Sequence, residues 1–458
     1  MERKTQHIII GTALIAASAA AAATISYSDT PKTGDVVISP AAKADARPAM
    51  LPSTAKAGAL TMLTNAAPTL GLADSVIETF HDSDVNLCGT TKVKQDGPVR
   101  IFEDQFNVLH MTISDANAKG WQWHGSVTGF TNNPKTAILD CTGVMTGNVG
   151  NTDPSKFDQK TWIQGFYFDG TTAWAYGHED YWGNRVNNDP DCHKSGVVDG
   201  KPGCWYAAIA TWKANPVSSA NRHLDFTRDG TAPDHIAIYP HVQYPGDALT
   251  PTSGWIGYGA PSNIFRGRNQ DGTTDGYWYM FTYTNSGYAG QAKGVCLFRS
   301  ADPSDHTSWR AWDGNTTTPG FTQTMGNPYT TTNSTCAVVE PTIFSSYVRS
   351  VVWHKPSRHY VAIIRKSTGV YYSTSTDMLS WSTPTLLLTS TTDEAEYPVL
   401  VDFDGGDYGD DNFDRAYDNG KLYLFYRKKE STGAIRITRR KIDVTNYPAD
   451  PPGSGNPG

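Results

Sequence analysis

From residue 80 to residue 444, apolar and polar positions form short runs that end at Gly, Asp or Asn turns. Five segments each contain two such runs, rich in β-branched and aromatic residues: 99–114, 162–179, 262–284, 350–365 and 397–427. Each segment predicts two strands joined across a turn. The 3.6-residue period of an amphipathic helix is not sustained in this span. The pattern therefore predicts an all-β chain built from hairpins.

Five hairpins in this span leave roughly 70 residues for each unit, which suits a four-stranded propeller blade with long loops. A two-sheet sandwich, which also gives regularly spaced hairpins, is the alternative fold. The five hairpins resemble one another more than sandwich strands usually do. We therefore predict a five-bladed β-propeller that forms a single domain over residues 80–444.

The two ends of the chain have a different composition. Residues 1–27 begin with Arg3 and Lys4 and continue as an apolar stretch that ends in alanines. This predicts a cleaved secretory signal peptide, with an uncleaved membrane anchor as the alternative. Residues 28–79 are rich in Ala, Thr, Pro and Ser and predict a flexible linker, and residues 445–458 predict a disordered tail. We expect a secreted or periplasmic protein.

Six cysteines follow the predicted signal, and an even number in an exported chain favours disulfides. Cys192 and Cys204 bracket a short polar loop and form the best predicted pair. Six cysteines allow 15 connectivities; proximity along the chain suggests Cys88 with Cys141 and Cys296 with Cys336. A zinc site is the alternative, and the lack of a Cys-x-x-Cys motif in the sequence disfavours it.

Charged residues make up 18% of the chain, aromatic residues 11%, and the net charge is −7. This composition excludes a disordered chain and a coiled coil, and it provides no basic field for nucleic acid or acidic lipid. The sequence contains no nucleophile elbow, P-loop, zinc-protease motif or dinucleotide fingerprint. We therefore predict a monomer without a cofactor, without a nucleic-acid partner and without membrane contact after signal cleavage.

Two segments carry a serine, an aspartate and then a tryptophan: Ser300, Asp302 and Trp309 in one, and Ser375, Asp377 and Trp381 in the other. Both resemble the Asp-box turn of sialidase-type propellers, although neither has the glycine of that motif. In such a turn the serine and aspartate bond the turn backbone, and the tryptophan packs between blades. The motif supports the propeller and says nothing about chemistry.

The hairpins and these turns resemble the five-bladed propeller carbohydrate enzymes of the arabinanase, xylosidase and levansucrase type. A closer resemblance, to a family of secreted bacterial proteins of that architecture, is carried by DGTTAWAYGHEDYWG (169–183), CWYAAIATW (204–212), APSNIF (260–265) and residues 294–314 and 396–427. It spans most of residues 98–428. The resemblance implies a carbohydrate substrate and carboxylates that come from the inner strands of different blades. Where such sequences often carry His-Asn-Glu-Tyr, this chain has residues 178–181 as His-Glu-Asp-Tyr.

Three acids are the candidate catalytic residues. Glu340 directly precedes a proline and Glu396 lies two residues before one, so each is expected at the entrance of an inner strand; Asp180 ends the second strand of the second blade. Glycoside hydrolysis needs one protonated carboxylic acid and one carboxylate that acts as base or nucleophile, and a third charged group separates their protonation. A solvated turn residue or a backbone cap is the alternative for each glutamate.

Seven further residues are predicted to bind the substrate: His178, Glu179, Tyr181, Arg100, Asp104, Asn263 and Arg299. An arginine offers paired hydrogen bonds to hydroxyl or carboxylate groups. Tyr181, Trp182 and Trp123 are candidate surfaces for stacking sugar rings, and a structural role is the alternative for His178. The Asp-rich stretch 402–418 is interpreted as a solvated turn, because it lacks the Glu at position 12 of an EF-hand loop. Calcium in the channel is the alternative.

Together these residues predict a glycoside hydrolase that cleaves a polysaccharide or an oligosaccharide. Two other functions stay open. A non-catalytic carbohydrate-binding propeller would use the aromatic residues without turnover. A polysaccharide lyase would use His178 as the base and Tyr181 as the acid, with an arginine that neutralises a uronate.

Overall fold

The computed structural model describes residues 66–85, 87–133, 136–186, 189, 192, 197–198, 201–202, 204–214, 218, 222–248, 254–285, 287–390, 394–403, 412–417 and 420–447. These residues form an all-β propeller of five blades, as the hydrophobic pattern predicts. The predicted signal peptide and most of the predicted linker and tail lie outside the described residues. Within the described part, no helix is long and apolar enough to cross a membrane.

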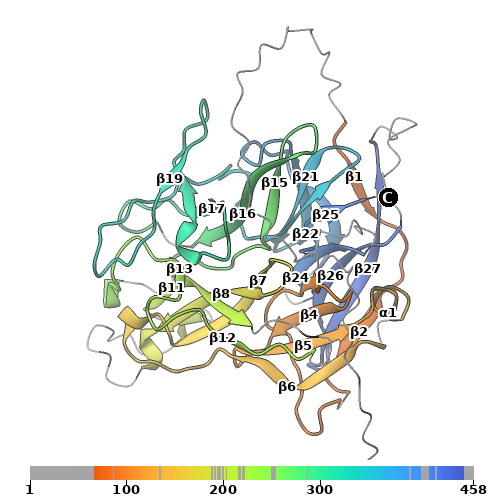
Figure 1. Cartoon of the computed structure of the whole chain (residues 1–458), viewed down its shortest axis with the longest axis horizontal. Coiled ribbons are helices and arrows are strands. Elements are labelled where there is room, and N and C mark those ends of the chain that lie inside the picture. The colour runs from red at the N-terminus through yellow and green to blue at the C-terminus, as the bar shows by residue number, and fades with distance from the viewer. Residues whose placement is uncertain are drawn as a thin grey trace, which may run out of the picture. The chain divides into compact units, whose positions relative to one another are not determined.

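The blades follow one another in chain order and are numbered I to V here (Figure 1). Blade I contains β3 (Arg100–Glu103), β4 (Leu109–Ser114), β5 (Lys119–Gly125) and β6 (Ile138–Thr146), with the short helix α1 (Val127–Asn132) between β5 and β6. Blade II contains β7 (Lys160–Phe168), β8 (Ala173–Trp182), β11 (Trp205–Ala214) and β12 (Phe226–Arg228), and β13 (Ile236–Ile238) and β14 (Ile256–Gly257) also pair with β11. The strands β9 (Val197–Val198) and β10 (Lys201–Pro202) pair with each other.

Blade III contains β15 (Phe265–Arg268), β16 (Thr274–Thr284), β17 (Gly294–Ser300), β18 (Arg310–Trp312) and β19 (Phe321–Gln323). Blade IV contains β20 (Val348–His354), β21 (His359–Lys366), β22 (Gly369–Ser375) and β23 (Thr385–Thr389), and β25 (Arg415–Ala416) pairs with β20. Blade V contains β24 (Glu396–Asp402), β26 (Leu422–Lys429) and β27 (Ile435–Thr445), joined by β1 (Thr69–Leu72) and β2 (Glu78–Asp82). In each blade the first strand, β3, β7, β15, β20 or β24, is the innermost.

Blade V is completed by strands from both ends of the described chain. β27 pairs with β26 along one edge and with β1 and β2 along the other, with Thr69 opposite Thr445 and Asp82 opposite Arg436 (Figure 1). The propeller sheet therefore begins at Thr69, within the linker predicted for residues 28–79. These strands are short, and their pairing partner lies at the other end of the sequence, so the local composition does not reveal them.

The two predicted Asp-box turns form as expected. Ser375 Oγ accepts hydrogen bonds from the backbone N–H groups of Asp377 and Met378, at 3.1 and 2.8 Å. The buried Trp381 ring packs against Phe281 of blade III, with the ring centroids 5.9 Å apart. In the other turn, Trp309 Nε1 donates to the hydroxyl of Tyr176 in blade II. The tryptophans therefore pack between blades, as the motif predicts.

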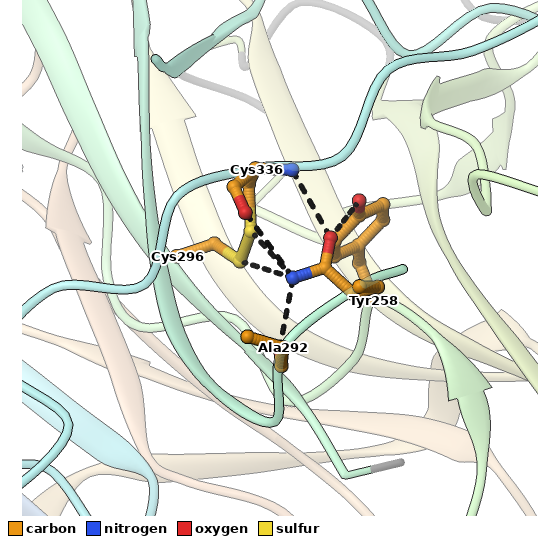
Figure 2. Close-up of a disulfide and its surroundings, with 5 residues drawn as sticks. Tyr258, Ala292, Cys296 and Cys336 are labelled. Carbon is orange, nitrogen blue, oxygen red and sulfur yellow. Dashed lines mark hydrogen bonds between the residues drawn. A yellow bond between two sulfur atoms is a disulfide. The ribbon is translucent and has the colours of Figure 1, made fainter. Parts of the chain in front are cut away.

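All three predicted disulfides are confirmed: Cys88–Cys141, Cys192–Cys204 and Cys296–Cys336. Figure 2 shows the third, which connects β17 to the loop after β19. Gln291 supports that loop, since its Oε1 accepts the Cys336 N–H at 3.0 Å and its Nε2 donates to the Cys336 carbonyl at 3.2 Å. The Tyr258 hydroxyl donates to the same Oε1.

Candidate active site

A cavity of about 240 Å³ lies where the innermost strands of the five blades begin, and we call it the channel cavity. Each blade contributes at least one residue close to the start of its innermost strand. The aromatic lining consists of Trp162, Trp182, Trp205, Trp255, Tyr347 and Tyr397. The charged and polar lining consists of Asp96, Gln164, His178, Asp180 and Arg349, and Ala116 and Ala260 complete it.

Asp180 and His178 reach the channel cavity from β8. Residues two apart on a strand lie on the same face, so both side chains point to the same side of blade II. His178 Nε2 lies 2.8 Å from Asp180 Oδ1, and the Asp180 side chain is only 5% exposed. The Trp205 indole N–H, on the neighbouring strand β11, donates to the same oxygen at 2.7 Å. Asp180 is therefore an acid held among aromatic rings.

Asp96 enters the channel cavity from the loop before β3. Its Oδ1 accepts hydrogen bonds from the Tyr397 hydroxyl at 3.0 Å and from Arg427 at 3.2 Å. The second terminal nitrogen of Arg427 lies 3.0 Å from Glu396 Oε2. The Asp96 side chain is 33% exposed. A cation and a phenol thus fix the position of a partly exposed carboxylate in the channel cavity.

Tyr397 has an unusual backbone conformation for a large side chain. Its φ is +54°, in the left-handed region, and the pairing of β24 with β26 shifts register between Glu396 and Val399. Bulges of this kind redirect side chains beside active sites. Burial raises the pKa of the Tyr397 phenol, and the nearby Asp96 charge adds to this effect. The phenol therefore stays protonated and donates to Asp96.

Several polar atoms around the channel cavity are buried without a hydrogen-bond partner among the described residues. They are Gln164 Oε1, Trp182 Nε1, Trp255 Nε1 and Arg349 Nε. The Arg349 guanidinium lies over the rings of Tyr347 and Tyr397, 4.3 and 5.1 Å from their centroids. Buried polar groups normally have a partner, so these four atoms can bond water or a polar ligand in the cavity.

Two predicted substrate-binding residues lie on the opposite face of β8. Glu179 is buried and accepts hydrogen bonds from the N–H groups of Gln159 and Lys160 and from the Thr161 hydroxyl, at 2.7, 3.1 and 2.5 Å. Burial raises its pKa to about 8. The Tyr181 hydroxyl donates to the Thr152 carbonyl and to Asp189. Strand alternation turns both side chains away from the channel cavity.

Arg100 and Asn263 do not line the channel cavity and instead join blades. Arg100 is buried and donates to the backbone carbonyls of Gln164 in blade II and Arg349 in blade IV. Burial and the nearby Arg349 charge lower its pKa. Asn263 makes two hydrogen bonds with the backbone of Val351, at 2.8 and 2.7 Å. Both residues position the strands that carry the cavity lining.

Asp104 belongs to a buried network between blades I and II. It bonds the N–H groups of Phe106 and Val108, His110 Nε2 at 3.0 Å and Arg222 at 2.9 Å. Burial opposes its ionisation, but these hydrogen bonds outweigh that effect and lower its pKa. Trp123, a candidate stacking surface, is 2% exposed and packs in the core. Neither residue lines the channel cavity.

Glu340 and Arg299 line a second cavity, which lies between blades III and IV. Glu340 was predicted at the entrance of the innermost strand of blade IV. That strand, β20, begins only at Val348, so the prediction is wrong for Glu340. Tyr347 and Arg349 occupy the expected position instead. Glu396 does begin the innermost strand of blade V and is connected to the channel cavity through Arg427 and Asp96.

Asp96 and Arg349 are the main residues that the sequence reasoning missed. A usable signal was present for Asp96, because it lies two residues before Pro98 just as Glu396 lies two residues before Pro398. The same rule applied to the first blade would have selected it. No such signal marks Arg349 in the sequence, because its place in the cavity depends on where β20 begins.

This chain is similar in structure to propeller glycoside hydrolases. The family 117 glycoside hydrolase Zg3597 of Zobellia galactanivorans has a TM-score of 0.44 and 10% identity, covering 86% of this chain and 95% of that one. An α-L-arabinofuranosidase of Lactobacillus brevis has a TM-score of 0.40 and 9% identity, covering 76% of this chain and 91% of that one. The arabinanase Arb43A of Bacillus subtilis has a TM-score of 0.39 and 10% identity, covering 80% of this chain and 97% of that one. No protein-family model matches the sequence, and no curated protein matches it. At such identities the chemistry has to come from the residues of the site.

Among the described residues, metal-ligating side chains come together in one place. One group of suitable geometry emerges, Cys192, Cys204 and Asp247, but the two sulfurs form a disulfide and cannot act as thiolates. Most of the Asp-rich stretch 402–418 lies outside the described residues. Of its two described aspartates, Asp402 accepts the Tyr417 N–H and Asp414 accepts the Arg266 N–H, so both bond backbone.

Proposed function

We propose that the protein is a secreted glycoside hydrolase that cleaves a polysaccharide or an oligosaccharide in the channel cavity. One observation carries the proposal: Asp96 and Asp180, from different blades, line the same small cavity together with four tryptophans and an arginine. Two carboxyl groups that flank one bond are what glycoside hydrolysis needs. Indole rings stack on the apolar faces of sugars.

The two acids have different surroundings, which suits different roles. Asp96 is partly exposed, so that water can reach it, and Arg427 and Tyr397 fix its position; we assign it the role of base or nucleophile. Asp180 lies almost fully buried among indole rings and beside His178, and we assign it the role of general acid. It donates its proton to the glycosidic oxygen as the bond to the anomeric carbon breaks. Asp96 activates water or attacks that carbon.

Other lining residues hold the sugar. Gln164 Oε1 and the indole N–H groups of Trp182 and Trp255 have no partner among the described residues and are available to sugar hydroxyls. Arg349 provides a guanidinium with a fixed orientation between two tyrosine rings. Glu396 acts through Arg427 and thereby positions Asp96. A cavity of about 240 Å³ suits a terminal sugar unit better than a long stretch of polymer.

Export is part of the proposal. The three disulfides fit an oxidising compartment, and the apolar N-terminal stretch fits a signal peptide. Mass spectrometry of protein recovered from culture medium, expressed with its own N-terminus, tests this. An intact N-terminus found only in the membrane fraction would contradict secretion.

The test of the reaction compares three variants on neutral polysaccharides and aryl glycosides. Asp96→Asn and Asp180→Asn should each lower kcat by about 10²- to 10⁴-fold, the usual contribution of an acid–base group. Asp180→Asn should keep far more activity on dinitrophenyl glycosides, whose leaving group needs no proton. Asp225→Asn, at an exposed aspartate, is the control and should behave as wild type. Full activity in both cavity variants would exclude this mechanism.

A non-catalytic sugar-binding propeller is the second candidate. Its support is that Asp180 is already engaged by the Trp205 indole and lies against His178. If the protein binds sugars of the panel without turnover, and Trp205→Ala abolishes that binding, the non-catalytic function is favoured. The lyase hypothesis requires Tyr181 beside His178, whereas the Tyr181 hydroxyl bonds Thr152 and Asp189 on the other face of β8.

A further inference from the structure

The second cavity has a volume of about 470 Å³ and shares no lining residue with the channel cavity; we call it the inter-blade cavity. One wall is a face of blade III formed by β15 to β19. The opposite wall is the Asp-box turn of blade IV, from Asp377 to Ser380. Its size falls within the range of roughly 300–1,000 Å³ that is typical of small-molecule sites.

The blade III wall presents aromatic rings in adjacent strands. Trp312 lies opposite Phe321, and Tyr279 lies opposite Arg299. The Arg299 guanidinium covers the Phe321 ring, 4.4 Å from its centroid, and the ring remains partly exposed. The wall therefore combines aromatic side chains with a guanidinium that lies over one of them, and aromatic side chains of this kind bind the apolar face of a sugar ring.

The polar groups of the inter-blade cavity include two that are not engaged. Among the described residues, the Glu340 carboxylate has no hydrogen-bond or ion-pair partner, and Arg268 Nε is buried without one. Glu340 has a φ of +41°, a strained conformation that non-glycine residues adopt mainly at functional sites. A carboxylate that accepts and a guanidinium that donates can together bind two adjacent hydroxyl groups.

The charges of the lining select among ligands. Three acids, Glu340, Asp275 and Asp377, line the cavity together with two arginines, Arg268 and Arg299, so the excess of negative charge disfavours a uronate or another anion. A purely apolar ligand would leave Glu340 and Arg268 without partners. A neutral sugar satisfies both groups and stacks on the rings.

We propose that the inter-blade cavity is a second, non-catalytic binding site for a neutral sugar unit. It holds a distant part of the polysaccharide, or a second chain, while the channel cavity is occupied by another unit. The site does not depend on the proposed hydrolase activity, because its residues are separate from Asp96 and Asp180.

The experiment measures sugar binding by calorimetry on the full chain carrying Asp96→Asn and Asp180→Asn, which removes turnover of the probe. The probes are neutral arabino-, xylo-, galacto-, gluco- and manno-oligosaccharides, with oligogalacturonate as the anionic comparison. Phe321→Ala and Glu340→Gln should each raise one dissociation constant about tenfold, through lost stacking and a weakened charged hydrogen bond. The matched controls are Phe106→Ala and Glu394→Gln, at exposed positions, and they should leave every dissociation constant unchanged.

The outcomes separate the two proposals. A binding event weakened by Phe321→Ala and Glu340→Gln but not by Arg349→Gln establishes the second site. The inference is overturned if no neutral probe binds, if neither inter-blade variant changes the dissociation constant, or if only the anionic probe binds. The hydrolase proposal is tested separately, by the activity of the wild type. Should Phe321→Ala unfold, Ser380→Tyr fills the cavity from its exposed rim and has the same expected effect.

Discussion

Replacing Glu179 with glutamine should make the protein more stable at alkaline pH and leave its stability at acid pH nearly unchanged. The glutamate is buried, and burial raises its pKa from 4.5 to about 8. Between these values the folded protein keeps a proton that the unfolded chain has released. Stability that this group contributes is therefore full below pH 4.5 and is lost as the pH rises toward 8. At about 1.4 kcal/mol for each pH unit, the loss amounts to about 5 kcal/mol.

Glutamine can replace the protonated acid with little rearrangement. Its carbonyl oxygen takes the place of the Oε1 that accepts from Gln159 and Lys160, and its amide faces the Thr161 hydroxyl, which can also accept. The variant has no proton to lose, so its stability should not carry this pH dependence.

The measurement is urea unfolding of the wild type and of Glu179→Gln at several pH values from 5 to 9, with the disulfides oxidised. The free energy of unfolding of the variant minus that of the wild type should rise by several kcal/mol across this range. Glu394→Gln, at an exposed glutamate, serves as the matched control and should give a constant difference. A constant difference for Glu179→Gln as well would refute the argument that β8 carries a buried, protonated acid on the face that points away from the channel cavity.

Three further predictions follow from the cross-links and networks. Cys88→Ser with Cys141→Ser opens a loop with a sequence separation of 53 and should lower the free energy of unfolding by about 4 kcal/mol, measured by denaturant titration. Asp104→Asn should destabilise the protein at neutral pH, and this destabilisation should shrink as the pH falls through the depressed pKa of the aspartate. The melting temperatures of wild type and variant at pH 7 and at pH 3 measure the difference. Tyr397→Phe removes a donor to Asp96 and should lower kcat about tenfold without changing the melting temperature much, and unchanged kinetics would show that the phenol does not hold Asp96.

The features that the sequence predicted well depend on local patterns. Alternating strands, turn residues and the serine and aspartate of the Asp-box turns are encoded within about fifteen residues, and all of these formed. Strand alternation also explains why His178 and Asp180 reach one cavity while Glu179 and Tyr181 do not, although the prediction grouped all four. Adjacent residues in a strand face opposite sides, and that rule was available from the sequence alone.

The features that escaped prediction depend on long-range pairing. Glu340 looks like the start of an inner strand, but its positive φ turns the chain and β20 begins only at Val348. The partner of β1 lies about 370 residues away in the sequence, so no local signal identifies this strand. Asp96 reaches the channel cavity from a loop, held by Tyr397 and Arg427 of the last blade. Contacts of this kind follow from the closed ring and not from neighbouring residues.

The pairing of β27 with both β26 and β1 also has a consequence for the order of folding. β27 leaves the ribosome after every other described strand, so β1 has no partner before then, and blade V keeps an open edge until β27 has been made. Bringing segments that far apart together carries a large loop-closure entropy, and long-range strand pairing is slow. We expect the ring to close as a late folding event. A chain truncated before Ile435 would keep unpaired edges on β1, β2 and β26, where other chains can pair and aggregate.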